Sequence, residues 1–222
     1  MIAAYGGINN EFAKQADVEN WVLGQEGQGF VWLDPDNASV LSFLIGIMED
    51  AWRGYQKLGL KGLQLDDHFS SPTSLGKTVE SMNSAMQTLR EELNASCGSE
   101  MILSLAPSPL DQALYSYNVD WNLWGDNFWF DECVPQLYRS TYKDFKSLFD
   151  QTLRGVSRST QKLLRACGLR VDGSGEPTPW EDVENSIEYA EEFGVDPVIW
   201  YAHGVVELYP EEFSQLWGNG GK

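Results

Sequence analysis

The chain has 222 residues, of which 42% are hydrophobic and 13% aromatic, and this composition excludes an intrinsically disordered protein. Its 33 acidic and 15 basic residues give a net charge of −18, which argues against nucleic acid and anionic membranes as partners, because both attract basic surfaces. No stretch approaches the ~20 apolar residues of a membrane-spanning helix. The nine tryptophans fit carbohydrate binding, where indole faces stack on sugar rings, although core packing explains any one of them equally well.

The three cysteines are too few for a disulfide framework and lack the spacing of zinc ligands. Cys133 and Cys167 fall in or beside predicted strands, so we expect buried, reduced thiols. Met1 is not followed by the basic and apolar regions of a signal peptide. We therefore expect a soluble protein, and an extracytoplasmic compartment (periplasm, envelope or thylakoid lumen) fits if a targeting segment has been removed.

The predicted elements alternate between strands and helices along the chain. Residues 1–28 contain several glycines and are expected to form an irregular segment with one short helix at 11–22. Asn37 is a candidate N-cap for a long helix after the first strand. The predicted strands cover 29–33, 62–65, 101–105, 132–138, 162–170 and 196–201. The predicted helices cover 38–57, 75–94, a short segment within 113–130, 142–154, 178–193 and 207–217.

Strands that begin roughly every 30 to 40 residues with helices between them indicate parallel strands joined by crossover helices. Both a doubly wound open sheet and a (β/α)8 barrel fit this rhythm. No glycine-rich phosphate loop follows any strand, which weighs against a nucleotide-binding open sheet. Residues 29–222 show no linker or change of composition, so we expect one α/β domain of about six parallel strands.

The most informative motif is Gly62-Leu63-Gln64-Leu65-Asp66-Asp67-His68-Phe69, an apolar strand that ends in two adjacent carboxylates. Ligands bind at the C-terminal ends of parallel strands. Adjacent like charges repel and raise each other's pKa, so two acids there are a poor choice for stability alone. Either at least one of them is functional, or Asp66 caps the next helix and Asp67 faces solvent.

Polar residues also follow the other predicted strands, and a barrel would bring them to one face. Paired acids with aromatic residues are what glycoside hydrolysis needs, because one carboxylate stabilises or attacks the oxocarbenium-like centre while a second protonates the leaving oxygen. Helix capping explains several of these acids equally well. The candidates beside the Asp-Asp-His motif are Asp34, Ser104, Ser108, Gln136, Tyr138, Arg139, Asp172, Glu176, His203 and Glu207.

Five segments occur in order along the chain: Trp32-Leu33-Asp34-Pro35, the Asp-Asp-His motif, Leu103-Ser104-Leu105-Ala106-Pro107-Ser108, Asp120-Trp121 and Val134-Pro135-Gln136-Leu137-Tyr138-Arg139. Together they resemble the glycosyl-hydrolase-like 10 family, a glycosidase or lipoprotein group with a (β/α)8 barrel. The resemblance spans about residues 29 to 205. It implies a hydrolase directed at polysaccharide or peptidoglycan, with Asp66 and Asp67 as the acidic pair of the fourth barrel strand. It also implies that Gln136, Tyr138 and Arg139 form the sixth-strand cluster and that the origin is cyanobacterial or plastid-like.

The chain departs from this family at its beginning, because residues 1–28 leave no room for the first two β-α units. An incomplete barrel leaves strand edges open, so we expect a protein partner to cover them. Our leading hypothesis is a glycoside-hydrolase-like protein that acts on a cell-envelope polysaccharide, or descends from one that does. The alternative is a non-catalytic accessory subunit of a larger complex, built on a truncated hydrolase barrel.

In the enzyme hypothesis, Asp66 is the nucleophile or stabilising carboxylate, Asp67 orients it or binds a sugar hydroxyl, and Glu207 donates the proton. The expected substrate-binding residues are Asp34, His68, Gln136, Tyr138, Arg139 and His203. A polysaccharide or oligosaccharide is the expected small partner, and no metal or organic cofactor is implied.

Overall fold

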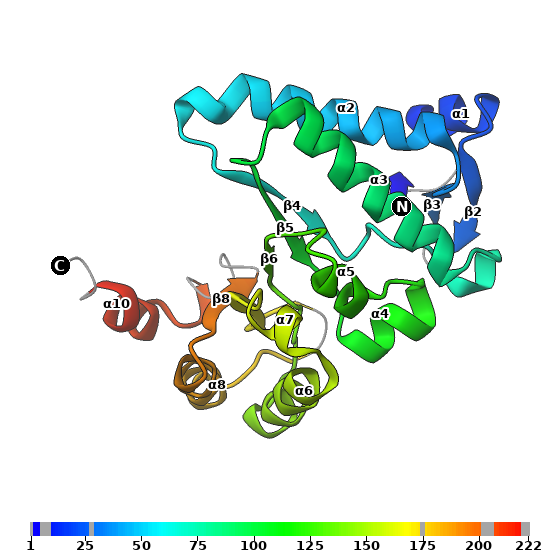
Figure 1. Ribbon diagram of the computed structural model, residues 1–222. Helices are drawn as coiled ribbons and strands as arrows, with labels where there is room; N and C mark the ends of the chain where they lie inside the picture. Colours follow the sequence, from blue (N-terminus) through cyan, green and yellow to red (C-terminus); the bar gives the residue numbers. More distant parts are fainter. Residues whose placement is uncertain (1, 5–9, 27–28, 174–175, 201–206, 219–222) are drawn as a thin grey trace. The chain divides into compact units, whose positions relative to one another are not determined.

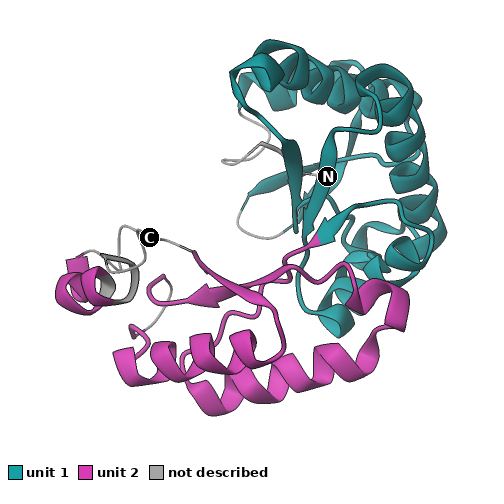
Figure 2. Ribbon diagram, turned by 60° about the vertical axis from the view of Figure 1, so that its left-hand side comes forward, with its two compact units in different colours: residues 1–132 teal, residues 133–222 magenta. Residues whose placement is uncertain are grey.

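A computed structural model describes residues 2–4, 10–26, 29–173, 176–200 and 207–218. The chain forms two compact units, residues 1–132 and residues 133–222 (Figure 2). The boundary that we expected at residue 28 lies inside the first unit. None of the described helices has both the length and the apolar character that crossing a membrane requires.

Unit 1 begins with an antiparallel sheet in which β3 lies between β1 and β2 (Figure 1). Its elements are β1 (Ile2–Ala4), α1 (Glu11–Val18), β2 (Val22–Glu26) and β3 (Phe30–Leu33). The prediction of a parallel strand at 29–33 after an irregular segment is therefore corrected. The physical reason is that residues 27–29 are the whole connection from β2 to β3, and so short a connection allows only a hairpin.

The rest of unit 1 is a β-α-β arrangement whose two strands are parallel. Its elements are α2 (Ala38–Tyr55), the 3-10 helix η2 (Gln56–Leu58), β4 (Gly62–Asp66), the 3-10 helix η3 (Thr73–Leu75), α3 (Val79–Cys97), β5 (Ile102–Ala106), α4 (Leu110–Tyr117) and α5 (Trp121–Asp126). β4 and β5 pair in register from Gly62 opposite Ile102 to Asp66 opposite Ala106. A side chain at Gly62 would collide with the Ile102 backbone, so glycine permits this close pairing. The register places Asp66 at the carboxyl end of the strand pair.

The helices of unit 1 begin where side chains satisfy free backbone N–H groups. The Asn37 side chain accepts the N–H of Ser39, which confirms it as the N-cap of α2, and Thr78 caps α3 in the same way. α2 and α3 lie on one side of β4 and β5 in both views (Figures 1 and 2). Most of the largest fully buried side chains of this unit come from α3, α5 and the strands, and they include Trp121, Trp124, Met82, Met86, Leu103 and Leu105.

Unit 2 contains a second parallel strand pair, β7 with β8, and a core of its own. The strand β6 (Glu132–Cys133) lies at the boundary of the two units, and the elements that follow are α6 (Tyr142–Gly155), α7 (Arg158–Gln161), β7 (Ala166–Arg170), α8 (Trp180–Glu192), β8 (Asp196–Trp200) and α10 (Pro210–Gly218). The core joins α6 and α8 to the strands through buried residues that include Phe145, Phe149, Leu169, Val183 and Ile187. Figure 2 shows α6 and α8 along the same side of β7 and β8.

The expected strand at 132–138 is shortened to β6. Pro135 has no N–H to donate, so the segment continues beside β7 only through isolated parallel bridges, Cys133 with Leu164 and Gln136 with Gly168. In the described part of the chain the strands form separate sheets rather than a closed barrel. The structure is thus a mixed α/β protein with parallel strand pairs.

The reactivity of the three cysteine thiols tests how deeply each side chain is buried. Cys133 and Cys167 are buried and free, as expected, whereas Cys97 at the end of α3 is partly exposed. Burial raises the pKa of the Cys167 thiol to about 12, and only a thiolate attacks a disulfide reagent. We expect only Cys97 to react quickly with an aromatic disulfide in the native protein, and all three thiols to react after unfolding in guanidinium. A fast phase that survives Cys97→Ser, or fewer than three thiols in denaturant, would contradict this.

Candidate functional site

The carboxylates at the end of β4 belong to a tight turn. The backbone oxygen of Asp66 accepts the N–H of Phe69 at 3.0 Å, and its side chain accepts the N–H of Asp67 at 2.9 Å. Phe69 is buried, and its ring meets Trp124 edge-on with the centroids 6.2 Å apart. Because Phe69 fixes the turn in the core of unit 1, Asp66, Asp67 and His68 are held at the carboxyl end of the strand.

His68 lies between the two carboxylates. Its Nδ1 is 3.0 Å from Oδ1 of Asp67 and 3.3 Å from Oδ2 of Asp66. The hydrogen bonds to Asp66 and then to Asp67 raise the pKa of His68 to about 9, against the opposing effect of its partial burial. At neutral pH this cluster therefore holds two carboxylates and one imidazolium, and their charges sum to −1.

The raised pKa of His68 predicts how stability depends on pH. An imidazole with a folded-state pKa of about 9 and an unfolded value of 6.5 stabilises the fold fully below pH 6.5 and loses that contribution as the pH rises through about 9. The pairs are partly exposed, so we expect a loss on the order of 1 kcal/mol. Urea unfolding at pH values on either side of this interval measures it.

The control for this pH prediction is His68→Gln, which should remove most of the pH dependence. An unchanged pH dependence in that variant, or a nuclear magnetic resonance signal assigned to His68 that titrates near 6.5, would show that the imidazolium is not held by the two carboxylates.

Polar and aromatic residues from other elements surround this cluster. Ser108, two residues beyond β5, donates a hydrogen bond from Oγ to Oδ2 of Asp67 at 3.1 Å. The rings of Phe30 and Trp32 on β3 lie 6.0 and 6.5 Å from the His68 ring, measured between centroids. The parallel pairing of β4 and β5 explains why Ser108 and Asp67 meet, as expected from the ends of neighbouring strands.

A cavity of about 110 Å³ adjoins the cluster, lined by Glu26, Phe30, Trp32, Asp67, His68, Ser70 and Tyr117. Carboxylates, an imidazole and aromatic rings thus line one small hollow. Sequence reasoning missed Glu26 and Tyr117 as lining residues. The sequence contained a clue to Phe30 and Trp32, because the alternation of side chains along a strand places both on one face of the first predicted strand.

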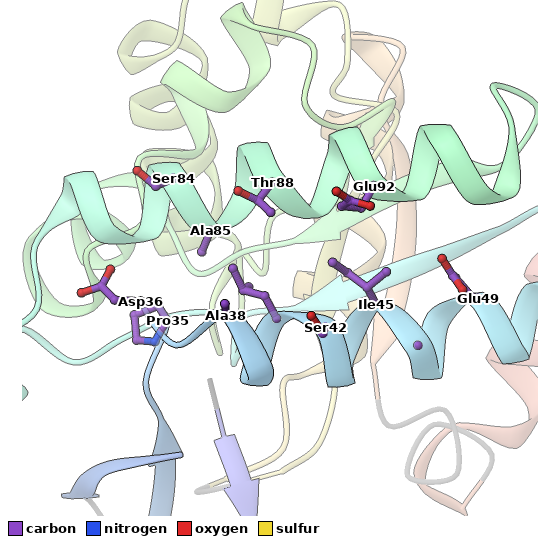
Figure 3. A pocket seen from close by; sticks show the side chains of 12 residues that line it. Pro35, Asp36, Ala38, Ser42, Ile45, Glu49, Ser84, Ala85, Thr88 and Glu92 are labelled. Carbon is purple, nitrogen blue, oxygen red and sulfur yellow. The ribbon is translucent and has the colours of Figure 1, made fainter. Parts of the chain in front are cut away.

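A larger cavity of about 540 Å³ lies between α2 and α3 (Figure 3). Its lining includes small side chains such as Ala38, Ser42 and Ala85, and none of the predicted site residues lines it. Of its carboxylates, Asp36 is paired with Lys77 and Glu49 with Arg53. We therefore regard it as a groove between packed helices, and the smaller cavity as the candidate site.

Asp34, a predicted substrate-binding residue, is held by local contacts after β3. Its Oδ1 is 2.6 Å from Nζ of Lys77 and accepts the N–H of Asp36 at 2.9 Å. It is not among the residues that line the 110 Å³ cavity. Lys77 forms ion pairs with both Asp34 and Asp36. The sequence did not indicate these pairs, because Lys77 lies some 40 positions farther along the chain.

The remaining predicted residues belong to unit 2. Gln136 bridges to Gly168, and a side chain at Gly168 would collide with the ring of Tyr138. Arg139 donates from Nη1 to the backbone oxygen of Tyr138 at 2.6 Å, and Glu207 is exposed. His203 lies outside the described residues.

The Asp66, Asp67 and His68 side chains are also the one described group of three that could hold a metal ion, with their ligand atoms within 4.8 Å of one another. A metal ligand must be deprotonated, however, and the raised pKa keeps a proton on His68 at neutral pH. Proton loss would have to accompany any binding of a cation.

Comparison with known proteins gives a fold but no family. No protein-family model matches the chain, and neither does any curated protein. The glycosyl-hydrolase-like 10 family in particular is thus not supported. A solved structure of a fungal endo-β-N-acetylglucosaminidase from glycosyl hydrolase family 18 is similar, with a TM-score of 0.52 and 18% sequence identity. The match covers 80% of this chain and 59% of that structure, so the chain spans about three fifths of it. At this identity the likeness concerns the fold alone, which resembles that of a glycosidase.

Proposed function

We propose that this chain is a glycosidase-like protein that acts on a β-linked polysaccharide of the cell envelope. The observation that carries the proposal is the cluster of two carboxylates and an imidazolium at the end of β4, beside an aromatic-lined cavity. The likeness of the fold to a family 18 glycosidase supports it. That enzyme's name states that it cleaves β-N-acetylglucosaminides, which supports a β-linked glycan here.

Asp66 is the proposed nucleophile or stabilising carboxylate. Its side chain is half exposed, so a sugar ring can approach it, and the charge of −1 on the cluster favours the positive charge that develops at the anomeric carbon. Asp67 is more buried and accepts a hydrogen bond from Ser108, which suits a residue that orients Asp66 or binds a sugar hydroxyl.

Asp66 and Asp67 cannot form an inverting pair by themselves. Their ligand oxygens lie within 4.8 Å of each other, whereas inverting enzymes keep their carboxyl groups ~6.5–9.5 Å apart to admit a water molecule. Because we assign Asp67 to orienting Asp66 or binding a sugar hydroxyl, the proposed mechanism takes its proton donor from elsewhere, and Glu207 remains our proposal for it. Gln136, Tyr138, Arg139 and His203 remain proposed sugar-binding residues.

The second candidate is a glycan-binding protein without hydrolytic activity. One observation favours it: His68 already pairs with both carboxylates, which reduces the negative charge available to a reacting sugar. This candidate shares with the accessory-subunit alternative only the absence of hydrolysis.

The purified chain incubated with β-linked envelope polysaccharides tests both candidates. New reducing ends support the glycosidase, and saturable binding without new reducing ends supports the second candidate. Neither binding nor new reducing ends with any of the polysaccharides would contradict both.

A further inference from the structure

The groove of about 540 Å³ between α2 and α3 has no part in the proposed function. Its floor is apolar, and the floor residues Leu41 and Ile45 are each only 8% exposed, while Ala85 is 1% exposed. Along its middle, the exposed residues at the edges carry small side chains, and these are Ala38, Ser42, Ser84 and Thr88. Another polypeptide can therefore reach the apolar floor without displacing large side chains.

Gly46 opens the groove further on the α2 side. Glycine destabilises the interior of a helix relative to alanine, so a glycine there is expected where packing within the protein excludes a side chain. Packing does not require Gly46, because among the described residues a Cβ at this position would meet nothing within 4 Å beyond the backbone of its own helix. Gly46 continues the four-residue spacing of Ala38 and Ser42 on one face of α2. The absent side chain thus leaves a place where a partner can approach α2 closely.

Every charged residue in the described lining of the groove is acidic. Asp36 lies at one end, and Glu49 and Glu92 lie at the other (Figure 3). Asp36 and Glu49 each pair with a basic residue outside the lining, but the Glu92 carboxylate forms no ion pair with a described residue. These carboxylates and the net charge of −18 favour a cationic occupant and oppose a second copy of this chain.

The form of the groove suits a helical occupant. Its lining runs from Ala38 to Glu49 on α2 and from Ser84 to Glu92 on α3, which at the rise of a helix corresponds to roughly 16 Å and 12 Å, or two to three turns. The walls are the sides of helices, whose backbone groups are already paired. An extended segment would find few backbone partners there, whereas a helix pairs its own backbone groups and packs its side chains between the rows on α2 and α3.

We propose that the groove between α2 and α3 binds an amphipathic helix of a partner protein. The apolar face of that helix packs on Leu41, Ile45 and Gly46, and its lysine or arginine side chains pair with Glu92 and its neighbours. The inference goes beyond the proposed function and does not depend on it, because no residue of the candidate site lines this groove.

The test measures, by fluorescence anisotropy, the binding of a labelled synthetic peptide to the full chain. The probe is a helical peptide of about 18 residues, with alanine and leucine on one face and lysine on the other. One control peptide carries glutamate in place of every lysine, and another keeps the lysines but has two central prolines that interrupt the helix. We expect the lysine helix to bind at least about tenfold more tightly than either control peptide.

Matched variants locate the bound peptide. Gly46→Gln places a helix-favouring side chain in the groove, so it should not lower the melting temperature but should weaken binding of the lysine helix by at least about tenfold. The control is Gly54→Gln, because Gly54 also lies in α2 beside open space but does not line the groove, and its affinity should be unchanged. Glu92→Gln should weaken binding about twofold to fivefold, whereas Glu91→Gln, at an exposed neighbouring residue outside the lining, should not.

Four results would overturn the proposal. Equal affinities of the Gly46→Gln and Gly54→Gln variants would show that general charge attraction holds the peptide, and no binding of the lysine helix would leave the groove without this partner. Equal binding of the proline-interrupted peptide would exclude a helical occupant. A dimer of the chain in analytical ultracentrifugation that Gly46→Gln dissociates would assign the groove to a second copy instead.

Discussion

Asp66→Asn is expected to lower the rate of polysaccharide hydrolysis by at least about 100-fold. The substitution keeps the size of the side chain and an oxygen that can still accept the N–H of Asp67, but it removes the negative charge that would face the developing positive charge of the sugar. Folding should be preserved, because Asp66 is half exposed and its lost ion pair with His68 contributes at most about 1 kcal/mol. Reducing-end assays measure the rate, and circular dichroism checks the fold.

The matched control is Asp17→Asn on α1, which removes the charge of an exposed carboxylate elsewhere in unit 1. This variant should hydrolyse at the rate of the unmodified protein. If Asp66→Asn also keeps the full rate, Asp66 has no catalytic role and the glycosidase proposal loses its central residue.

The largest effect on stability is expected from Trp124→Ala, with a loss of about 3–5 kcal/mol in the free energy of unfolding of unit 1. Trp124 is fully buried in α5, and its indole N–H donates to Oδ1 of Asn83 at 2.6 Å. Its ring also meets Phe69, which anchors the turn of Asp66, Asp67 and His68. Urea unfolding followed by circular dichroism measures the loss.

Two comparisons interpret the Trp124 result. Trp124→Phe keeps most of the buried ring but loses the hydrogen bond to Asn83, so its cost should be smaller than that of the alanine variant. Leu123→Ala changes the neighbouring residue, whose side chain is 37% exposed, and should cost less than about 1 kcal/mol. Similar costs at positions 123 and 124 would mean that the core of unit 1 is not packed around Trp124.

The parts of the fold that the sequence predicted well are those set by local signals. The strand that ends at Asp66 and its neighbour at 102–106 are short apolar runs. Asn37 is a residue type that favours helix N-caps, and it caps the helix that was expected to follow it. The hairpin at the N-terminal end was missed because its glycine-rich connection looked like an irregular loop. A strand's direction is decided by its partner, so the apolar run at 30–33 could not by itself show that β3 is antiparallel.

The candidate site also contains residues that their position in the sequence indicated and residues that it did not. Asp66, Asp67 and His68 are consecutive residues after one strand, and Ser108 follows the next, so position alone indicated them. Glu26 and Tyr117 were not predicted, because they reach the cavity through the register of a hairpin and the end of α4, which pack against a distant part of the chain. The pKa of His68 likewise depends on the direction of its ring, which a sequence does not specify.

The most direct test of the central proposal, that the Asp66-Asp67-His68 cluster is where a glycan binds, is a titration monitored at His68. The chain has two histidines, so a sample with isotope-labelled histidine gives two sets of ring signals, and the variant His203→Gln assigns the one from His68. Addition of a soluble oligosaccharide of a β-linked envelope polysaccharide should shift the His68 ring signals until they saturate, and should move its pKa away from about 9. Unchanged His68 signals at concentrations that saturate the protein in calorimetry would place the glycan elsewhere and contradict the account.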